Sequence, residues 1–472
     1  MIGVNKQEQS NVSLNIGTQK SYSEIIELLD SKWKIEADKT LSRMRQLDAA
    51  VGSPSKKLNT IFVAGSNGKS LTINFISQIF KEEGFISGSF YSPHFLTYNE
   101  RINLNKSEII QNKQFTEIAN EVINAAEAEG INPSTKEILT AIAFKYFVIS
   151  NVDVAILELV ENNSFDPINI CNSKVLAITR VTDNEEKENA TKIETLINNL
   201  CSITKKDSWV ISADQSKISL QKMQIKVLEQ GAKWAMPIRK LAPLTYPFEQ
   251  LHGRCAALAE RAAQIFAEEY ITKNTEIISD GLLIKPKAQR GRPTIEAKKQ
   301  SELNPRKTVE QFWKDSCTLL SGHFQLLDKE KPTILLDNSN NLDALSNLLL
   351  GVRLLNYKKP FKGLVLIYNY ENNIIESVEF LKQVRYFFKK TSGQLIISPA
   401  AKSAWQNPVN VNIDKVINNL KNTKLKASSA KNFNEAFDKA KKLVDERNGL
   451  VIITGGSSAI TEYWNSKGIK KL

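Results

Sequence analysis

Short, continuous apolar runs alternate along the first half of the chain with segments in which apolar residues recur every three or four positions. Continuous apolar runs are typical of strands that are buried on both faces of a sheet. Apolar residues at helical spacing predict amphipathic helices. For this half the pattern predicts strands over 60–64, 152–159, 175–181 and 208–212, and helices over 22–47, 69–83 and 254–269.

The apolar period disappears between 271 and 306 and then restarts. Strands that alternate with helices build mostly parallel sheets, and 472 residues exceed one ordinary core. After the restart the pattern predicts strands over 332–337, 363–368, 395–398 and 449–454, and helices over 342–354, 375–389 and 432–446. We therefore expect an α/β protein with a flexible tail over 1–20, an N-terminal domain over 21–270, a basic linker or insertion over 271–316 and a smaller C-terminal domain over 317–472.

The composition is that of a globular protein, with 42% hydrophobic and 24% charged residues. No run of about 18 apolar residues is present, and Met1–Gln19 is polar, so we expect neither a membrane-spanning helix nor a secretion signal. The four cysteines lie far apart and include no CxxC pair, which favours a reducing compartment and a cytoplasmic protein. Only three histidines are present in the chain, which excludes a histidine-cluster metal site.

The chain is basic, with 63 Lys and Arg against 51 Asp and Glu, a net charge of 63 − 51 = +12. A dense part of this charge lies in 285–307, where Arg290–Pro293 (RGRP) resembles the core of an AT-hook, which reads the DNA minor groove. The patch could instead attract anionic substrates toward a cleft, or it could be a solvated connector. We expect no binding to nucleic acid, and the other two interpretations stay open.

The strongest chemical signal is a glycine-rich loop between the strand over 60–64 and the following helix. Its glycines let backbone amides turn inward, and amides at a helix N-terminus form a cradle for phosphate groups. Lys69 would reach the β and γ phosphates of a nucleotide, and Ser70 would offer a hydroxyl near magnesium. Val63 stands where the strict P-loop pattern has glycine, so a glycine turn with a solvated lysine is the alternative. The cradle residues are Gly65, Ser66, Asn67, Gly68, Lys69 and Ser70.

Five stretches, in order along the chain, resemble known motifs. The loop GSNGKS resembles the GTNGK loop of the Mur ligase superfamily. The other four are similar to motifs of folylpolyglutamate synthase/dihydrofolate synthase. Leu41–Asn59 resembles the segment that ends in LGNP, and Phe90–Ile102 (FYSPHFLTYNERI) resembles YTSPHL…ERI. Glu137–Phe144 with Val152–Asn169 resembles ExxTAxAF and DVAVLEVGLGGRLDATN, and Gly322–Leu342 resembles PGRFEVL…ILDGAHNP. The chain therefore resembles a divergent member of this family over most of its length, apart from the tail and the linker.

The resemblance implies a P-loop ATPase-type N-terminal domain with a mostly parallel sheet and a smaller Rossmann-like α/β C-terminal domain. It also implies a ligase that uses ATP and Mg²⁺ to add L-glutamate to a carboxylate of folate or dihydropteroate through an acyl phosphate. We expect a monomer whose partners are these small molecules. Which carboxylate accepts the glutamate stays open at this point.

The family's functional residues transfer to particular positions of this chain. Lys69 and Glu158 would be catalytic, and Ser92 with Glu158 would hold the magnesium ion. Asp337 would contact the nucleotide from the C-terminal domain. The alternatives are that Glu158 is a solvated carboxylate at a strand end and that Asp337 caps the helix predicted from Leu342.

The three histidines are not predicted to do chemistry. His94 matches the histidine of the family's SPH motif, and we interpret it as structural. His252 and His323 have no metal-ligand partner at useful spacing, so we expect structural or surface roles for both.

The sequence departs from the family at the second metal site and around it. Asn184 stands in place of the histidine of GLDH, and Leu200 stands in place of a lysine that is carbamylated to hold that metal. The arginine of PGR is His323 here, the histidine of GAHN is Asn340, and Val160–Ser164 replaces GLGGR. We expect one magnesium site and no protein-held metal near Leu200. Either the chain is a divergent active ligase, or it is a nucleotide-binding relative that has lost ligation.

Overall fold

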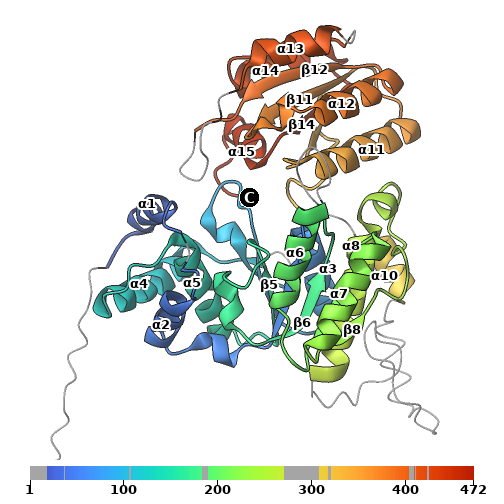
Figure 1. Cartoon of the computed structure of the whole chain (residues 1–472). Coiled ribbons are helices and arrows are strands. Elements are labelled where there is room, and N and C mark those ends of the chain that lie inside the picture. The colour runs from blue at the N-terminus through green and yellow to red at the C-terminus, as the bar shows by residue number, and fades with distance from the viewer. Residues whose placement is uncertain are drawn as a thin grey trace, which may run out of the picture.

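The computed structural model describes residues 19–36, 38–105, 108–182, 190–270, 308–316, 320–402, 409, 411–422 and 425–472. Within these ranges the chain forms two α/β units, coloured blue to yellow and orange to red in Figure 1. The basic patch over 285–307 and Asn184 lie outside the described residues. Across the described ranges, none of the helices combines the length and apolar character that crossing a membrane requires.

The N-terminal unit is built on an eight-stranded sheet with the strand order β4-β3-β2-β5-β1-β6-β7-β8. All neighbouring strands run parallel except the hairpins that place β3 and β4 at one edge. The strands are β1 (Thr60–Ala64), β2 (Ser87–Phe90), β3 (Ile102–Leu104), β4 (Glu108–Ile109), β5 (Val154–Glu158), β6 (Ser173–Ile178), β7 (Trp209–Ser212) and β8 (Lys233–Ala235).

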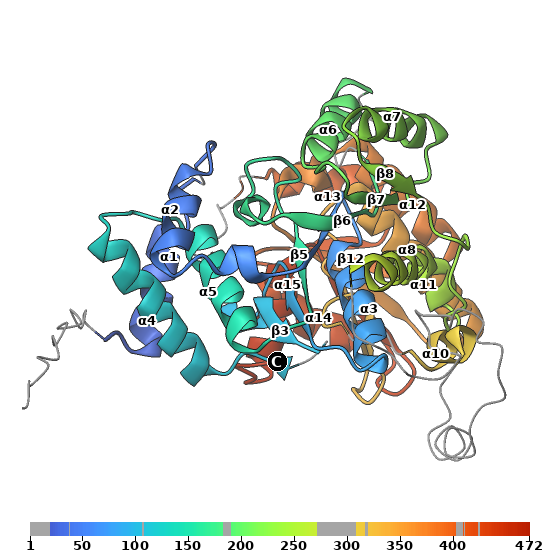
Figure 2. The same cartoon turned by 90° about the horizontal axis from the view of Figure 1, so that it is seen from below.

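Helices cover both faces of this sheet, which is why β1 and β5 are fully buried. Phe62 and Ala64 pack toward one set of helices, and Ile61 and Val63 pack toward the other. The first set is α1 (Tyr22–Lys32), α2 (Ser42–Ala50), α4 (Asn112–Ala128), α5 (Thr135–Ile149), α6 (Ala190–Ser202) and α7 (Lys217–Glu229). The second set is α3 (Lys69–Glu82), α8 (Phe248–Tyr270) and α10 (Val309–Asp315). Figure 2 shows part of the first set, α1, α2, α4 and α5, apart from α3 and α8.

The C-terminal unit is built on a six-stranded sheet with the order β13-β12-β11-β14-β10-β9, parallel except at β9. Its strands are β9 (Gln325–Leu327), β10 (Thr333–Leu336), β11 (Leu364–Tyr370), β12 (Gln394–Pro399), β13 (Ala427–Ser429) and β14 (Leu450–Thr454). One face is covered by α11 (Leu342–Lys358), α12 (Val378–Lys390) and α13 (Ile413–Asn422), the other by α14 (Phe433–Leu443) and α15 (Ser457–Ser466). The predicted α/β class with two units and mostly parallel sheets is confirmed.

Two details differ from the sequence prediction. The helix predicted over 22–47 is wrong as one element, because α1 ends at Lys32 and α2 begins at Ser42. Between them the Asp38 carboxylate accepts hydrogen bonds from the backbone N–H groups of Thr40 and Arg43, and Leu41 has a left-handed φ of 59°. A local turn therefore interrupts the apolar spacing.

The last residues of the predicted linker pack as part of the N-terminal core. Phe312 and Trp313 of α10 are buried, and the Trp313 ring meets Phe75 of α3 edge to face at 5.3 Å. The Trp313 indole N–H also donates to Glu260 of α8 at 2.9 Å. The chain therefore returns to the N-terminal unit before it enters the C-terminal sheet.

The loop after β2 joins the two units. Phe95, from the stretch that resembles SPH, is buried in the C-terminal core cluster with Ile460 of α15. The Thr461 hydroxyl donates to the Phe95 carbonyl at 2.6 Å. The loop that carries Ser92 is therefore fixed at one end by the C-terminal unit.

Candidate active site

The phosphate loop follows β1 directly, and α3 begins at Lys69, just after the last glycine, as the sequence predicts. Gly65 has a φ of +122° and Gly68 a φ of +86°, which favour glycine. A Cβ on Gly65 would lie 2.3 Å from Thr179 Oγ1 and 2.8 Å from the Arg180 carbonyl oxygen. The loop is therefore packed so closely on the neighbouring strand end that no side chain fits at Gly65.

We expect Gly65→Ala to remove ATP binding, whereas Gly52→Ala leaves it intact. Gly52 also has a positive φ, +89°, but a Cβ added there would meet nothing within 4 Å, so its substitution should cost about 1–2 kcal/mol from backbone strain alone. The overlap at Gly65 should add about 1–3 kcal/mol. Thermal unfolding with and without Mg·ATP measures both effects. An undiminished ATP-induced rise of Tm in Gly65→Ala would contradict this account of the loop.

Backbone carbonyls and one side chain from the neighbouring strand ends hold the loop in place. The Ser66 N–H donates to the Arg180 carbonyl at 2.7 Å, and the Ser66 hydroxyl donates to the Thr182 carbonyl at 2.8 Å. The Asn162 side chain accepts from the Gly65 N–H at 2.8 Å and donates to the Gly65 carbonyl at 3.0 Å. Asn162 lies in the segment that replaces the family's GLGGR. The residues that differ from the family therefore supply two hydrogen bonds to the loop, which the sequence resemblance did not indicate.

Lys69, Ser92 and Glu158 meet where β1, β2 and β5 end. The Lys69 ammonium lies 3.5 Å from Glu158 Oε1, and their side chains are 12% and 5% exposed. The Ser92 N–H donates to Glu158 Oε2 at 2.7 Å, and the Ser70 hydroxyl donates to the Ser92 carbonyl at 3.1 Å. Burial raises the pKa of Glu158, while the Lys69 ammonium and the Ser92 N–H oppose that shift. Glu158 is therefore a buried, paired carboxylate, and the alternative of a solvated one is wrong.

The donor set beside Lys69 fits a magnesium ion. Mg²⁺ is usually bound by one or two carboxylates, hydroxyls, waters and substrate phosphates. Glu158 and the hydroxyls of Ser70 and Ser92 supply such oxygen donors, and each still has lone pairs free. Among the described residues no cluster of three His, Cys, Asp or Glu side chains could form an all-protein cage. Magnesium binding by Ser92 and Glu158 stays a prediction.

A buried arginine, which the sequence comparison did not single out, positions Ser92. Arg101 Nη1 donates to the Ser92 hydroxyl at 3.1 Å, and Arg101 Nε donates to His94 Nδ1 at 2.8 Å. The His94 ring packs on Tyr98 at 4.5 Å, and burial lowers the pKa of His94 well below its usual value. His94 is thus a neutral acceptor that orients Arg101, which agrees with the structural role we expected for it.

The position of the family's carbamylated lysine lies in the core. Leu200, in α6, is fully buried among apolar residues. A leucine side chain offers no donor atom, so this position cannot hold a metal. The absence of a second protein-held metal stays a prediction, because Asn184 is outside the described residues.

Asp337 follows β10 directly and lines the same cavity as the phosphate loop. Its carboxylate accepts from the Phe324 N–H at 2.8 Å and from the N–H and hydroxyl of Ser339. The helix-cap alternative is wrong, because Asn341 caps α11 by accepting from the Ala344 N–H at 2.9 Å. Asp337 therefore has no capping role at this helix.

A cavity of about 1,060 Å³ separates the two units at this point. It is lined by the loop residues Ser66–Ser70, by Glu158 and Ser92, and by Asp337. His252 and His323 also line it. His252 is buried, so a surface position is wrong for it, whereas His323 is partly buried. Burial, with a contribution from His323, lowers the pKa of His252 to about 3. The match of position 323 to the arginine of PGR is the signal that could have placed His323 here.

The tip of the phosphate loop contacts the N-terminus of α11. Asn67 Nδ2 donates to Asp343 Oδ2 at 2.8 Å, and Asn341 Nδ2 donates to Asn67 Oδ1 at 2.9 Å. Arg180 Nη2 pairs with Asp343 Oδ1 at 2.8 Å. Sequence reasoning did not identify Arg180 or Asp343. These contacts fix the position of the two walls of the cavity relative to each other. A nucleotide bound in the cavity would therefore touch both units.

Known proteins resemble this chain in sequence over part of its length and in fold over nearly all of it. No protein-family model matches the chain. The "Dihydrofolate synthase/folylpolyglutamate synthase" of Bacillus subtilis is 29% identical over 247 residues, 51% of this chain and 54% of that protein. The chain spans about half the length of the curated relatives it matches.

Solved structures match over nearly the whole chain. Mycobacterium tuberculosis folylpolyglutamate synthase, complexed with ADP, matches with a TM-score of 0.73 and 18% identity, covering 95% of this chain and 98% of that one. The bifunctional enzyme of Yersinia pestis, complexed with AMPPNP and a Mn ion, matches with a TM-score of 0.71 and 16% identity over 95% and 98%. In fold, and in sequence over about half its length, the chain therefore resembles the folylpolyglutamate synthases of the Mur ligase superfamily.

Proposed function

We propose that this chain is an ATP-dependent ligase that adds L-glutamate to a carboxylate of folate or dihydropteroate through an acyl phosphate. The observation that carries the proposal is the meeting of Lys69, Ser92 and Glu158 beside a closely packed glycine loop, inside a cavity that both units close. The similarity to folylpolyglutamate synthases supports the choice of substrates.

The residues on the cavity wall suit phosphoryl transfer to a carboxylate. Such a reaction needs positioning and stabilisation of negative charge more than covalent chemistry by the protein. Lys69 would place its ammonium on the β and γ phosphates, and the amides of the loop would surround them. Mg²⁺ held by Ser92 and Glu158 would neutralise phosphate oxygens. Asp337 would orient the nucleotide from the other wall.

The second candidate is a nucleotide-binding relative without ligase activity. It is favoured by one observation, the buried Leu200 where the family has a lysine. Retention of the buried Lys69–Glu158 pair argues for active chemistry, because a buried ion pair is costly unless it is used or well compensated. A cytoplasmic location and a monomeric state remain predictions.

Genetic complementation tests the proposal. A bacterium that lacks its own folate-linked glutamate ligase should grow when it carries this chain, and should fail to grow with the Lys69→Ala variant. Immunoblots should show that both forms accumulate equally. No rescue by the accumulated wild-type chain, together with a Tm that still rises with Mg·ATP, would select the nucleotide-binding relative instead.

A further inference from the structure

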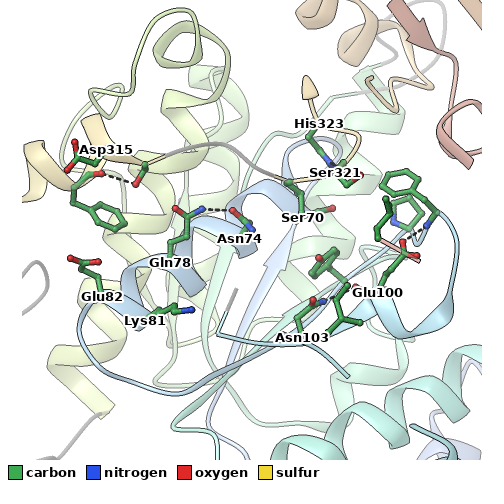
Figure 3. Close-up of a pocket in the computed structure, with 18 residues that line it drawn as sticks. Ser70, Asn74, Gln78, Lys81, Glu82, Glu100, Asn103, Asp315, Ser321 and His323 are labelled. Atoms are coloured by element: carbon green, nitrogen blue, oxygen red, sulfur yellow. Dashed lines mark hydrogen bonds between the residues drawn. The ribbon is translucent and has the colours of Figure 1, made fainter. Parts of the chain in front are cut away.

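A second cavity, of about 870 Å³, lies along α3 (Figure 3). Ser70, Asn74, Gln78 and Lys81 form one wall, at intervals that place them on one face of the helix. From Ser70 to Lys81 this wall is about 16 Å long at the helical rise per residue. Ser70, Pro93 and His323 line this cavity and the nucleotide cavity as well, so the two cavities meet at these residues.

The wall of the second cavity is polar although it is buried. Asn74 and Gln78 are only 5% and 7% exposed, and Gln78 Nε2 donates to Asn74 Oδ1 at 2.5 Å. Glu82 and Asp315 also line the cavity, toward the Lys81 end of this wall and away from Ser70 (Figure 3). Carboxylates attract an ammonium group, and side-chain amides can pair with the polar groups of an amino acid. The lining therefore suits an amine substrate that moves inward toward Ser70.

His323 stands where the two cavities meet, and its tautomer is fixed. In Figure 3, His323 and Ser321, which come from the segment leading into the C-terminal unit, lie above Ser70. His323 Nδ1 lies 2.9 Å from the Ser321 carbonyl oxygen, which can only accept a hydrogen bond, so Nδ1 carries the hydrogen. The lone pair of the neutral ring is therefore on Nε2.

The surroundings keep this ring neutral. Burial lowers the pKa of His323, although the Ser321 carbonyl and the Asp337 carboxylate oppose that shift. The titratable groups beside it are Asp337, after β10, and His252, on α8. A neutral imidazole with a free nitrogen is the usual general base of enzymes at neutral pH.

We propose that His323 Nε2 accepts the proton of the attacking amine, and that the amine arrives through the cavity along α3. The inference rests on the proposed ligase function. The ammonium gives one proton to His323, and its nitrogen lone pair then forms the C–N bond with the acyl carbon. The C–O bond to phosphate breaks, and the phosphate leaves with that electron pair and takes the second proton of the amine nitrogen. His323 returns its proton to water.

Hydroxylamine separates this step from the ones before it. Hydroxylamine is a neutral nucleophile that captures acyl phosphates without a base, so hydroxamate formation from ATP and the acceptor reports only activation of the carboxylate. In His323→Gln we expect hydroxamate formation within about 2-fold of wild type. Glutamate transfer should fall by about 100-fold or more, the usual contribution of a general base. The rate of glutamate transfer by the wild type should stay constant as the pH is lowered to about 6.5, the ordinary pKa of histidine, and somewhat below it. In the variant, the rate of glutamate transfer should rise with pH.

His323→Arg provides the matched comparison, because arginine is the residue of the family motif at this position and cannot act as a base at this pH. The proposal predicts that His323→Arg also loses transfer and retains hydroxamate formation. If His323→Arg transfers glutamate at the wild-type rate, His323 serves the phosphates by charge and the proposal is overturned. Equal losses of hydroxamate and transfer in His323→Gln would also overturn it. If the wild type forms no hydroxamate, the proposed ligase function itself fails.

Discussion

Lys69→Ala is expected to lower ATP turnover by roughly 10- to 100-fold, the range that corresponds to a lost hydrogen bond to a charged group. Two effects act together. The phosphates lose the ammonium that the loop presents, and Glu158, which is only 5% exposed in the structure, loses the cation 3.5 Å from its carboxylate. A carboxylate left unpaired at such a site is costly, so stability should fall as well.

The measurement for Lys69→Ala is ADP release at saturating acceptor and glutamate, with the Kd of ATP from titration. Lys439→Ala is the matched control, because Lys439 forms an exposed pair with Glu435 on α14, away from the cavity. Such surface pairs contribute at most about 1 kcal/mol, and this variant should turn over ATP like wild type. An unchanged Kd and unchanged turnover in Lys69→Ala would contradict the role of the phosphate loop.

Glu158→Gln is expected to lower the ligase rate by on the order of 100-fold or more and to raise the Mg²⁺ concentration needed for half-maximal rate. The substitution nearly preserves shape, so the Ser92 N–H keeps an acceptor while the anionic charge is lost. A magnesium ion held at this site would lose its carboxylate ligand, and Lys69 would lose the carboxylate that it pairs with. A Mg²⁺ titration of the initial rate separates the metal effect from a general loss of activity.

Glu161→Gln is the control for this carboxylate. Glu161 lies three residues further along, is 40% exposed and pairs with Lys136 on the surface. It should keep the wild-type Mg²⁺ dependence. The same Mg²⁺ dependence in Glu158→Gln and wild type would show that Glu158 does not hold the metal.

The local pattern of residues in the sequence is sufficient to predict the phosphate-loop half of the site. β1, the loop and the start of α3 follow from one apolar run, two glycines and a helical period, and the structure reproduces them within a residue. Lys69, Ser92 and Glu158 converge because parallel strands end at one edge of a sheet. Their convergence needs only the strand order, which the family resemblance implies.

The rest depends on contacts between residues far apart in sequence. Arg180 and Asp343 are 163 positions apart (343 − 180), and no local pattern shows that they pair across the cavity. Asn162 stands in a segment that has lost the family's glycines, yet its side chain holds Gly65 from both sides. His323 has no partner at useful spacing in sequence, because its neighbours Asp337 and His252 come from other elements of the fold.

The most direct test of the central claim follows one oxygen atom. The chain is supplied with ATP, Mg²⁺, L-glutamate and an acceptor whose carboxylates carry oxygen-18, and the released phosphate is examined by mass spectrometry. An acyl phosphate intermediate predicts that the labelled oxygen appears in inorganic phosphate, in proportion to the amide formed, and is absent from ADP. Phosphate without label, or ATP hydrolysis that does not depend on the acceptor, would contradict the account.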